Sequence, residues 1–539
     1  MYYHLLYVLL YLIALTLQLQ TPLGAHDQSP FDRDFDALAS QTLEHWRMSG
    51  LAIAVIDGNK TFSKGYGIER FPDKPVTSSS LFYAGSTTKS FTAAAISLLI
   101  DDTANTSRPL TWQTPLASIL GSDFIMQDAW TTTHVTLEDA LSHRTGQPGH
   151  DLSLLGPNNS LRDVVHKLRY LPPTAEIRTK WQYCNMMYVT VSYIIEKLTG
   201  VWLGHFLQTR IYDALNMSST FFSLADAKAA ADTGRVSLAQ GYAWVNSTRS
   251  YQPLSYMDSP VVSGAGATIS TVIDFTKWVR CLMTKSPPLS SAGHAALRYP
   301  RIAYTTVANE FTESSEFNLY SLGLGISFYR GELIVSHGGG LPGFKTLMAF
   351  LPNRQWGIVT MANTLEGPAD TILAFKLIDD LLGVPPPQRS DWGKRTEAAL
   401  QQKLYTLRHA REINYPDVPN PPIPLTLPLS EYAGLYTHPA YPTINLTLNR
   451  ATNRLYTLSC LHLLGEPIHA SLSHVSGDFF LVWARAYLGT EPKADDWNPW
   501  TDFVLKGEFR VGESGKVTRI GINIEPQMGE QNIWWERSA

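Results

Sequence analysis

A proline-rich segment towards the end of the chain constrains the fold most strongly. Six prolines fall within residues 416–428. Because proline lacks a backbone N–H and fixes its own φ angle, such a span neither continues a helix nor enters the centre of a sheet. The 539 residues also exceed the roughly 250–300 at which one hydrophobic core stops growing. We therefore expect separate domains on either side of a linker.

The two sides of this segment differ in their apolar patterns. Before it, a helix and strands are expected near both ends, with helical patterns between them, over 31–46, 51–56, 61–67, 332–336, 345–351, 356–361 and 369–382. Strands at both ends predict an antiparallel sheet flanked by helices and interrupted by a helical insertion, an α/β (α+β) fold. After the segment, short strand-like runs predict an antiparallel β domain, either a barrel or a sandwich.

These patterns predict where the chain divides. A mixed domain is expected over residues 26–385, a helical and proline-rich linker over 386–428, and the β domain over 429–539.

An apolar run precedes the first domain. Residues 5–19 are almost wholly apolar, which is shorter than the roughly twenty residues of a membrane-spanning helix. A secretory signal over residues 1–25 is therefore expected, with no stable membrane span, and an uncleaved signal anchor is the alternative. Six Asn-X-Ser/Thr sequons favour a secreted glycoprotein. They begin at Asn59, Asn105, Asn158, Asn216, Asn246 and Asn445.

Composition and missing motifs argue against several function classes. A net charge of −4 supplies no basic field for nucleic acid. The sequence contains no His-Glu-X-X-His motif, no Gly-X-Gly-X-X-Gly turn between a strand and a helix, and no Gly-Lys-Ser/Thr motif, so neither a metal nor a cofactor is expected. Three cysteines, Cys184, Cys281 and Cys460, allow at most one disulfide.

The first segment with candidate chemistry is Ser86-Thr-Thr-Lys89, at the start of a strongly apolar helix. Positions three apart on a helix lie on one face, a turn from each other. A serine hydroxyl becomes a nucleophile when a neighbouring base takes its proton, and a lysine is such a base when burial or nearby positive charge lowers its pKa. Ser-X-X-Lys also arises by chance about once in a chain of this size, so it needs support from other segments.

Two further segments supply a phenol, a carboxamide and glycines. Tyr183-Cys-Asn185 precedes another apolar helix. Residues two apart in an extended segment project the same way, which makes Tyr183 a candidate proton relay and Asn185 a hydrogen-bond partner for lysine or a substrate amide. His337-Gly-Gly339-Gly340 ends a strand, and glycines there let a substrate approach backbone N–H groups that stabilise an oxyanion. Taken singly, an ordinary helix start and a flexible turn explain these segments as well.

In combination, Ser-X-X-Lys, Tyr-X-Asn and a His-Gly-Gly strand resemble the serine β-lactamase and penicillin-binding protein superfamily. The chain is most similar to the branch of class C β-lactamases, D-aminopeptidases and related esterases. Further similar segments are Leu141–Gly146, Leu215–Thr220 and Ser263–Ser270. The resemblance covers about residues 33–385 and implies a β-lactamase-like catalytic domain for small-molecule or peptide substrates with an ester or amide bond. The last domain more weakly resembles the lipocalin-like modules of D-aminopeptidases.

The resemblance also implies roles for the three segments. Ser86 would be the acylated nucleophile, Lys89 its base and Tyr183 the proton shuttle. Asn185 would orient these groups or the substrate.

His337 stands where the family's Lys-Thr-Gly strand motif has its lysine, and Gly339 matches that motif's glycine. The backbone N–H groups of Ser86 and Gly340 would form the oxyanion hole. A histidine is mostly neutral near pH 7. Its presence therefore weakens recognition of a substrate carboxylate and favours esters or amides without one.

Three functions are compatible with these residues. We expect a secreted serine hydrolase that acts through an acyl-enzyme on Ser86. An acyltransferase of secondary-metabolite biosynthesis would use the same acyl-enzyme and pass the acyl group to an alcohol or amine. A non-catalytic scaffold on a β-lactamase-like fold is the third alternative, and the intact Ser86, Lys89 and Tyr183 argue against it.

Overall fold

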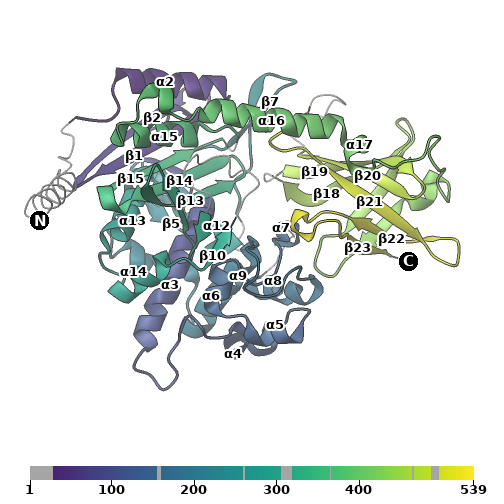
Figure 1. Cartoon of the computed structure of the whole chain (residues 1–539), viewed down its shortest axis with the longest axis horizontal. Coiled ribbons are helices and arrows are strands. Elements are labelled where there is room, and N and C mark those ends of the chain that lie inside the picture. Colours follow the sequence, from purple (N-terminus) through teal and green to yellow (C-terminus); the bar gives the residue numbers. More distant parts are fainter. Residues whose placement is uncertain are drawn as a thin grey trace, which may run out of the picture.

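The computed structural model describes residues 28–154, 160–258, 262–304, 318–364, 366–463, 466–486 and 497–538. The expected signal over residues 1–25 and the sequon at Asn158 lie outside these ranges. Figure 1 shows two bodies side by side, a larger mixed α/β body and a yellow-green barrel, with helix α16 (Trp392–Arg408) running between them. Within the described ranges, no helix is long and apolar enough to cross a membrane.

A nine-stranded antiparallel sheet forms the centre of the larger body. In spatial order its strands are β10 (Ile302–Tyr304), β11 (Asn318–Tyr320), β12 (Gly325–Tyr329), β13 (Glu332–Leu341), β14 (Phe344–Leu351), β15 (Trp356–Ala362), β1 (Gly50–Asp57), β2 (Lys60–Arg70) and β3 (Lys74–Pro75). Strands β1 and β15 pair from Leu51 with Ala362 to Asp57 with Trp356. The two ends of the stretch therefore meet in one sheet, which confirms the predicted fold.

Helices cover both faces of this sheet. Helices α2 (Arg33–His45) and α15 (Ala369–Leu381) share one hydrophobic cluster with alternate residues of β1. The other residues of β1 face a second cluster that contains α13 (Val272–Thr284). Helix α3 (Thr88–Thr103) contacts α9 (Asn185–Thr199) in this second layer and is buried along most of its length. Burial of β1 on both faces explains its continuous apolar run.

The insertion between β2 and β13 otherwise consists of short elements. Its helices are α4 (Leu116–Leu120), α5 (Ala129–His134), α6 (Leu137–Leu141), α7 (Asp151–Leu154), α8 (Leu161–Lys167), α10 (Leu203–Leu207), α11 (Leu224–Asp232), α12 (Ser263–Gly266) and α14 (Ser291–Arg298). Its strands outside the central sheet are β4 (Ser80–Tyr83), β5 (Thr220–Phe221), β6 (Ser237–Leu238), β7 (Tyr242–Val245), β8 (Ser250–Pro253) and β9 (Ile269–Ser270).

The linker is anchored to both bodies. Trp392, at the start of α16, stacks on Phe375 of α15 with ring centroids 4.2 Å apart. Helix α17 (Ala410–Asn414) follows, and Ala410 is buried with Val475 and Leu481 of the barrel. These contacts hold the barrel against the larger body, unlike a flexible tether.

The C-terminal body is a closed antiparallel barrel, which decides between the barrel and the sandwich. Its strands in chain order are β16 (Gly434–Thr437), β17 (Ile444–Asn449), β18 (Arg454–Leu463), β19 (Glu466–Ser476), β20 (Phe479–Ala486), β21 (Phe503–Val511), β22 (Val517–Ile522) and β23 (Ile533–Arg537). Alternate residues are buried, as Ile468, Ala470 and Leu472 of β19 illustrate.

Candidate active site

The turn before helix α3 presents a serine beside a lysine. Strand β4 leads into a 3-10 turn over Gly85–Thr87, and α3 follows. The Nζ atom of Lys89 lies 3.0 Å from the Oγ of Ser86 and donates a second hydrogen bond of 2.8 Å to the carbonyl oxygen of Ala265. Ser86 is half-buried and Lys89 is fully buried. A substrate can therefore reach the hydroxyl while the amine stays out of water.

Burial controls the charge of this lysine. Removal from water disfavours the ammonium form and lowers the pKa of Lys89 to about 7, although the negative charge of Asp151 opposes the shift. The rings of Tyr183 and Tyr188 lie with their centroids 4.8 and 5.3 Å from Nζ. Near neutral pH a large fraction of the amine is uncharged, and an uncharged amine can accept the serine proton.

Tyr183 and Asn185 stand at the start of α9. Burial raises the pKa of the Tyr183 phenol, and a hydrogen bond with Ser86 opposes the rise, so the neutral phenol contacts the serine. The Nδ2 of Asn185 donates to the Oδ1 of Asp151 over 2.9 Å. Its partner is thus a carboxylate, where the sequence favoured lysine or a substrate amide. Between the two motif residues, Cys184 is a buried free thiol whose pKa burial raises to about 12, which is unsuited to nucleophilic attack.

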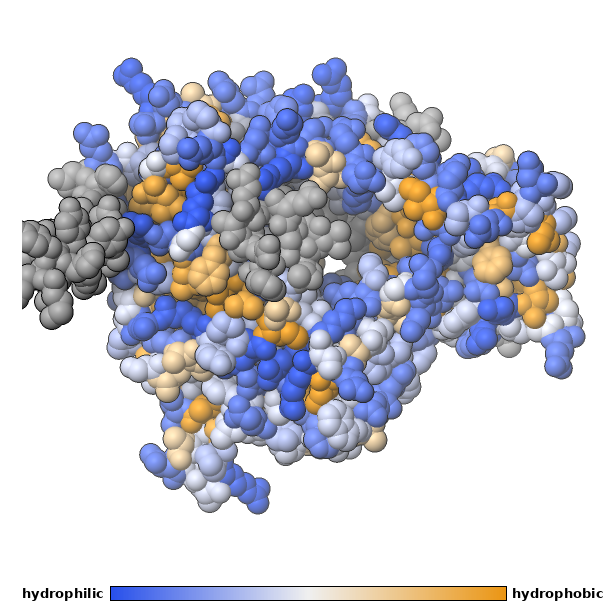
Figure 2. All heavy atoms as spheres, viewed as in Figure 1, coloured by the Kyte–Doolittle hydropathy of each residue, from blue (hydrophilic) through white to orange (hydrophobic). Residues whose placement is uncertain are grey.

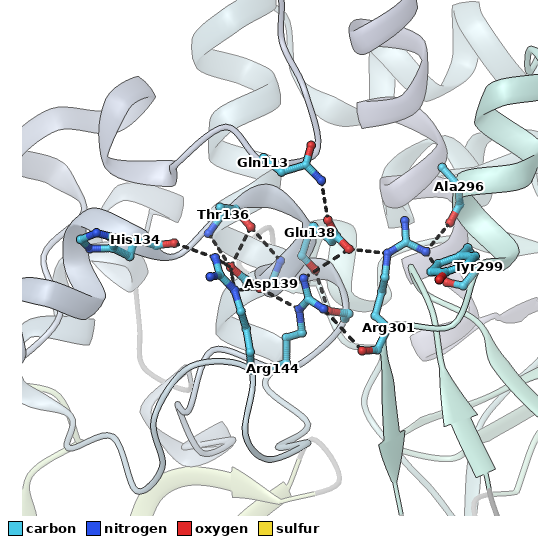
Figure 3. A network of polar contacts seen from close by, with 11 residues as sticks. Gln113, His134, Thr136, Glu138, Asp139, Arg144, Ala296, Tyr299 and Arg301 are labelled. Atoms are coloured by element: carbon cyan, nitrogen blue, oxygen red, sulfur yellow. Dashed lines mark hydrogen bonds and ion pairs between the residues drawn. The ribbon is translucent and has the colours of Figure 1, made fainter.

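A polar network holds the loop that contacts the start of α9 (Figure 3). Asp139 of α6 is fully buried and accepts hydrogen bonds from Arg144 at 2.7 Å and Arg178 at 2.8 Å. In the same loop, the Nδ1 of His143 accepts the backbone N–H of Cys184 over 3.0 Å. The segment Leu141–Gly146, which the sequence singled out as similar to the family, therefore positions the tyrosine motif through His143.

Strand β13 passes close to the serine turn. Strand β12 pairs with only the first half of β13. A Cβ atom built on Gly339 would lie 2.1 Å from the carbonyl oxygen of Ala84 and 3.1 Å from the nitrogen of Ser86. One built on Gly85, whose φ is +53°, would lie 2.8 Å from the nitrogen of Gly340. Glycine is required at both positions, and it brings two backbone nitrogens near the nucleophile, as an oxyanion hole needs.

His337 is tied into the protein by both ring nitrogens. Its Nδ1 lies 2.6 Å from the carbonyl oxygen of Gly338, so Nδ1 carries the proton, and its Nε2 accepts from the hydroxyl of Tyr320 over 2.9 Å. Burial, together with the charge of Lys89, lowers the pKa of His337 to about 4. The ring is neutral, so it does not supply the cation that the family's lysine provides. A direct contact with substrate requires the loss of one of these hydrogen bonds.

Sequence reasoning missed three groups that complete the site. Asp151, Tyr320 and the Ala265 carbonyl each contact a predicted site residue. Ala265 belongs to a segment that the sequence singled out without a role, whereas the other two lie outside every motif. Within the described part of the chain, no three or more His, Cys, Asp or Glu side chains are grouped to hold a metal ion.

Comparisons with known proteins identify the family. A model of the family described as Beta-lactamase matches residues 35–382. The chain belongs to the Beta-lactamase family. A second match, to a domain of unknown function called DUF3471, covers residues 418–537 and thus all eight strands of the barrel.

Two curated relatives align with the Beta-lactamase domain and the barrel together. The chain is 39% identical over 517 residues to an unguisins hydrolase of Aspergillus campestris, with 95% of this chain and 92% of the relative covered. It is 36% identical over 539 residues to an unguisins hydrolase of Aspergillus violaceofuscus, with 95% and 91% covered.

A solved structure shares the fold. The octameric penicillin-binding protein homologue from Pyrococcus abyssi aligns with a TM-score of 0.56 at 16% identity, and the alignment covers 93% of this chain and 99% of that chain. This likeness extends over both bodies and concerns the fold alone.

Proposed function

We propose that this protein is a serine hydrolase that cleaves an amide or ester bond through an acyl-enzyme on Ser86. The observation that carries the proposal is the 3.0 Å contact between the Ser86 hydroxyl and the buried amine of Lys89. A lysine with a pKa of about 7 is a base at neutral pH. Membership of the Beta-lactamase family and two relatives named hydrolases support the reaction type.

Catalysis would proceed in two halves. The neutral Lys89 takes the hydroxyl proton as the Oγ of Ser86 bonds to the substrate carbonyl carbon, and the N–H groups of Ser86 and Gly340 stabilise the oxyanion. The intermediate collapses with cleavage of the C–N or C–O bond, and the proton passes through the hydroxyl of Tyr183 to the leaving group. Water then gives a proton to the same groups, attacks the acyl carbon and releases the acid and the free serine.

The relatives suggest the substrate. Both Aspergillus proteins are named unguisins hydrolases, and we propose that this chain hydrolyses an unguisin or a closely related compound. The neutral ring of His337, with both nitrogens engaged, favours a substrate without a carboxylate beside the scissile bond.

Active-site labelling tests the nucleophile. A fluorophosphonate probe is expected to label the wild-type protein and not Ser86→Ala. Ser79→Ala, which removes an exposed serine just upstream, is the matched control and should label like the wild type. Equal labelling of Ser86→Ala and the wild type would contradict the acyl-enzyme.

Mass spectrometry tests the reaction. Incubation with an unguisin should give hydrolysis products whose total mass exceeds that of the substrate by one water, and Ser86→Ala should give none. If an added alcohol or amine accepts the acyl group in preference to water, the protein is an acyltransferase and not a hydrolase. Specific labelling of Ser86 without conversion of unguisin would refute unguisin as the substrate, while the proposed acyl-enzyme on Ser86 would still stand.

We also propose that the protein is secreted and glycosylated. The asparagines of the sequons within the described ranges are exposed, namely Asn59, Asn105, Asn216, Asn246 and Asn445, which suits glycan attachment. Expression of the full sequence in a eukaryotic host should release the protein into the medium, with a mobility shift after endoglycosidase treatment. Retention in cells without such a shift would refute this proposal.

A further inference from the structure

The barrel reaches the catalytic site through the segment between β22 and β23. The Oε1 of Gln527 accepts the backbone N–H of Gly149 at 3.2 Å, and the Oε2 of Glu525 accepts that of His150 at 2.7 Å. Burial lowers the pKa of the His150 ring to about 4 and keeps it neutral. Its Nε2 lies 3.5 Å from the carbonyl oxygen of Pro172 and carries the proton, so its Nδ1 accepts from the hydroxyl of Tyr441 over 2.7 Å. Three hydrogen bonds thus attach the loop before α7 to the barrel.

A cavity of about 290 Å³ lies at this junction, and both bodies line it. Asp151 and Tyr183 come from the Beta-lactamase domain, and Tyr441 and Glu525 come from the barrel. In Figure 1 helix α7 stands at the border of the two bodies, and Figure 2 shows a hollow between them on the same face. Because Tyr183 also contacts Ser86, a substrate bound at the serine can extend into the cavity.

The cavity offers hydrogen-bond acceptors. The Oδ1 of Asp151 accepts from Asn185, which leaves further lone pairs of this carboxylate for a ligand. Glu525 uses its oxygens differently, because Oε2 accepts from His150 and Oε1 accepts from the N–H of Gln527. The described residues that line the cavity include no lysine or arginine. Desolvation by the surrounding protein raises the pKa of both carboxyl groups, although Asp151 is an exposed residue. A donor from a ligand would favour their ionised forms.

We propose that this cavity is a substrate subsite in which the Asp151 carboxylate accepts a hydrogen bond from an N–H group of the substrate. The proposal rests on the proposed function and deepens it, since it names a nitrogen donor, either an amide or a protonated amine, near the scissile bond. Glu525 is a positioning residue, because its bond to His150 fixes the backbone directly before Asp151, the first residue of α7. The barrel thereby takes part in substrate selection.

A series of chromogenic esters tests this subsite. Their acyl groups are identical except at one position, which carries a free amine, an N-acetyl amide or a hydrocarbon without a donor. Wild-type kcat/KM should be about tenfold or more higher for at least one nitrogen donor than for the hydrocarbon, since a hydrogen bond to a charged acceptor contributes that much. A preference for the amine alone would show that the subsite binds a protonated amine. An equal preference for the amide would show that it binds a neutral N–H group.

Variants separate the subsite from the nucleophile. Asp151→Ala should lose the preference, Glu525→Gln should reduce it, and Glu530→Gln, at an exposed carboxylate of the same segment, should keep it. If Asp151→Ala does not fold, Asp151→Asn keeps the size of the side chain and should lose most of the preference for the amine. A preference that survives in the Asp151 variants, or none in the wild type, overturns the subsite.

Probe labelling distinguishes the two proposals. Glu530→Gln should react with fluorophosphonate at the wild-type rate. The Asp151 and Glu525 variants should still be labelled at Ser86, and in the Asp151 variants the pH below which labelling slows should be lower, because the charge of Asp151 favours the protonated form of Lys89. A loss of labelling in the Asp151 variants would show that Asp151 acts on the nucleophile instead. Absence of labelling in the wild type would defeat the proposed function itself. Intact labelling without a donor preference refutes only the subsite.

Discussion

Replacement of Lys89 by methionine should stabilise the protein near neutral pH while it abolishes turnover. The amine is fully buried, and its pKa is about 7 compared with an ordinary value of 10.5. Because the unfolded chain binds this proton more tightly, folding at pH 7 costs about 4 kcal/mol at this residue. Lys89→Met removes that cost and leaves the Ala265 carbonyl without its partner, a loss of about 2 kcal/mol. The expected net gain is about 2 kcal/mol.

The gain should depend on pH in a defined direction. Between about pH 7 and 10.5 the unfolded lysine binds more protons than the folded one, so wild-type stability rises with pH and the cost falls to about 2 kcal/mol at pH 9. The advantage of Lys89→Met should therefore disappear near pH 9. Urea unfolding of both full-length proteins, followed by tryptophan fluorescence at pH 7 and 9, measures the difference.

Lys180→Met, at an exposed lysine, is the control and should differ from the wild type by the same small amount at both pH values. A Lys89→Met protein that is less stable than the wild type at pH 7 would refute the reasoning. So would a difference in stability that does not change between pH 7 and pH 9.

Three further predictions concern activity. The rate of probe labelling should fall about tenfold per pH unit below about pH 7, where Lys89 is protonated; a constant rate from pH 5 to 8 would exclude this base. Gly339→Ala, whose Cβ would lie 2.1 Å from the carbonyl oxygen of Ala84, should lower kcat/KM by about 100-fold or more, whereas Gly338→Ala, with its nearest atom 3.9 Å away, should remain within about threefold of the wild type. Equal losses would contradict the close approach of β13. His337→Lys adds a cation beside Lys89, which should lower the pKa of Lys89, so the pH at which the labelling rate is half-maximal should move below 7. An unchanged half-maximal pH would show that a charge at position 337 does not affect the pKa of Lys89.

Local patterns predicted the fold where one element carries its own signal. The apolar run of β1 and its turn into β2 are visible in the sequence, and the strands near residue 350 have the same character. Strand β19 is harder to recognise because histidine and serine residues alternate with its buried Ile468, Ala470 and Leu472. Closure of the barrel depends on the pairing of β16 with β23, strands about a hundred residues apart, which no local pattern encodes.

The candidate site shows the same division between local and distant contacts. Ser86 and Lys89 are predictable because one helical turn brings them together. The partners of Asn185 and His337 are not, because Asp151 begins the short helix α7, far from Asn185 in the sequence, and Tyr320 lies on β11, two strands away from β13. The pKa of Lys89 likewise depends on burial, which the complete fold creates.

The rigid linker has a consequence for exchanging domains between relatives. Trp392 is stacked on Phe375, and Ala410 is buried against the barrel. The length and position of α16 therefore determine the position of the barrel relative to the Beta-lactamase domain. A chimera that joins this Beta-lactamase domain to another member's barrel would have to carry the linker helix and both sides of the junction as one unit. Inheritance of the barrel alone would leave the two halves of such a hybrid mismatched, so we expect these segments to change together as relatives diverge.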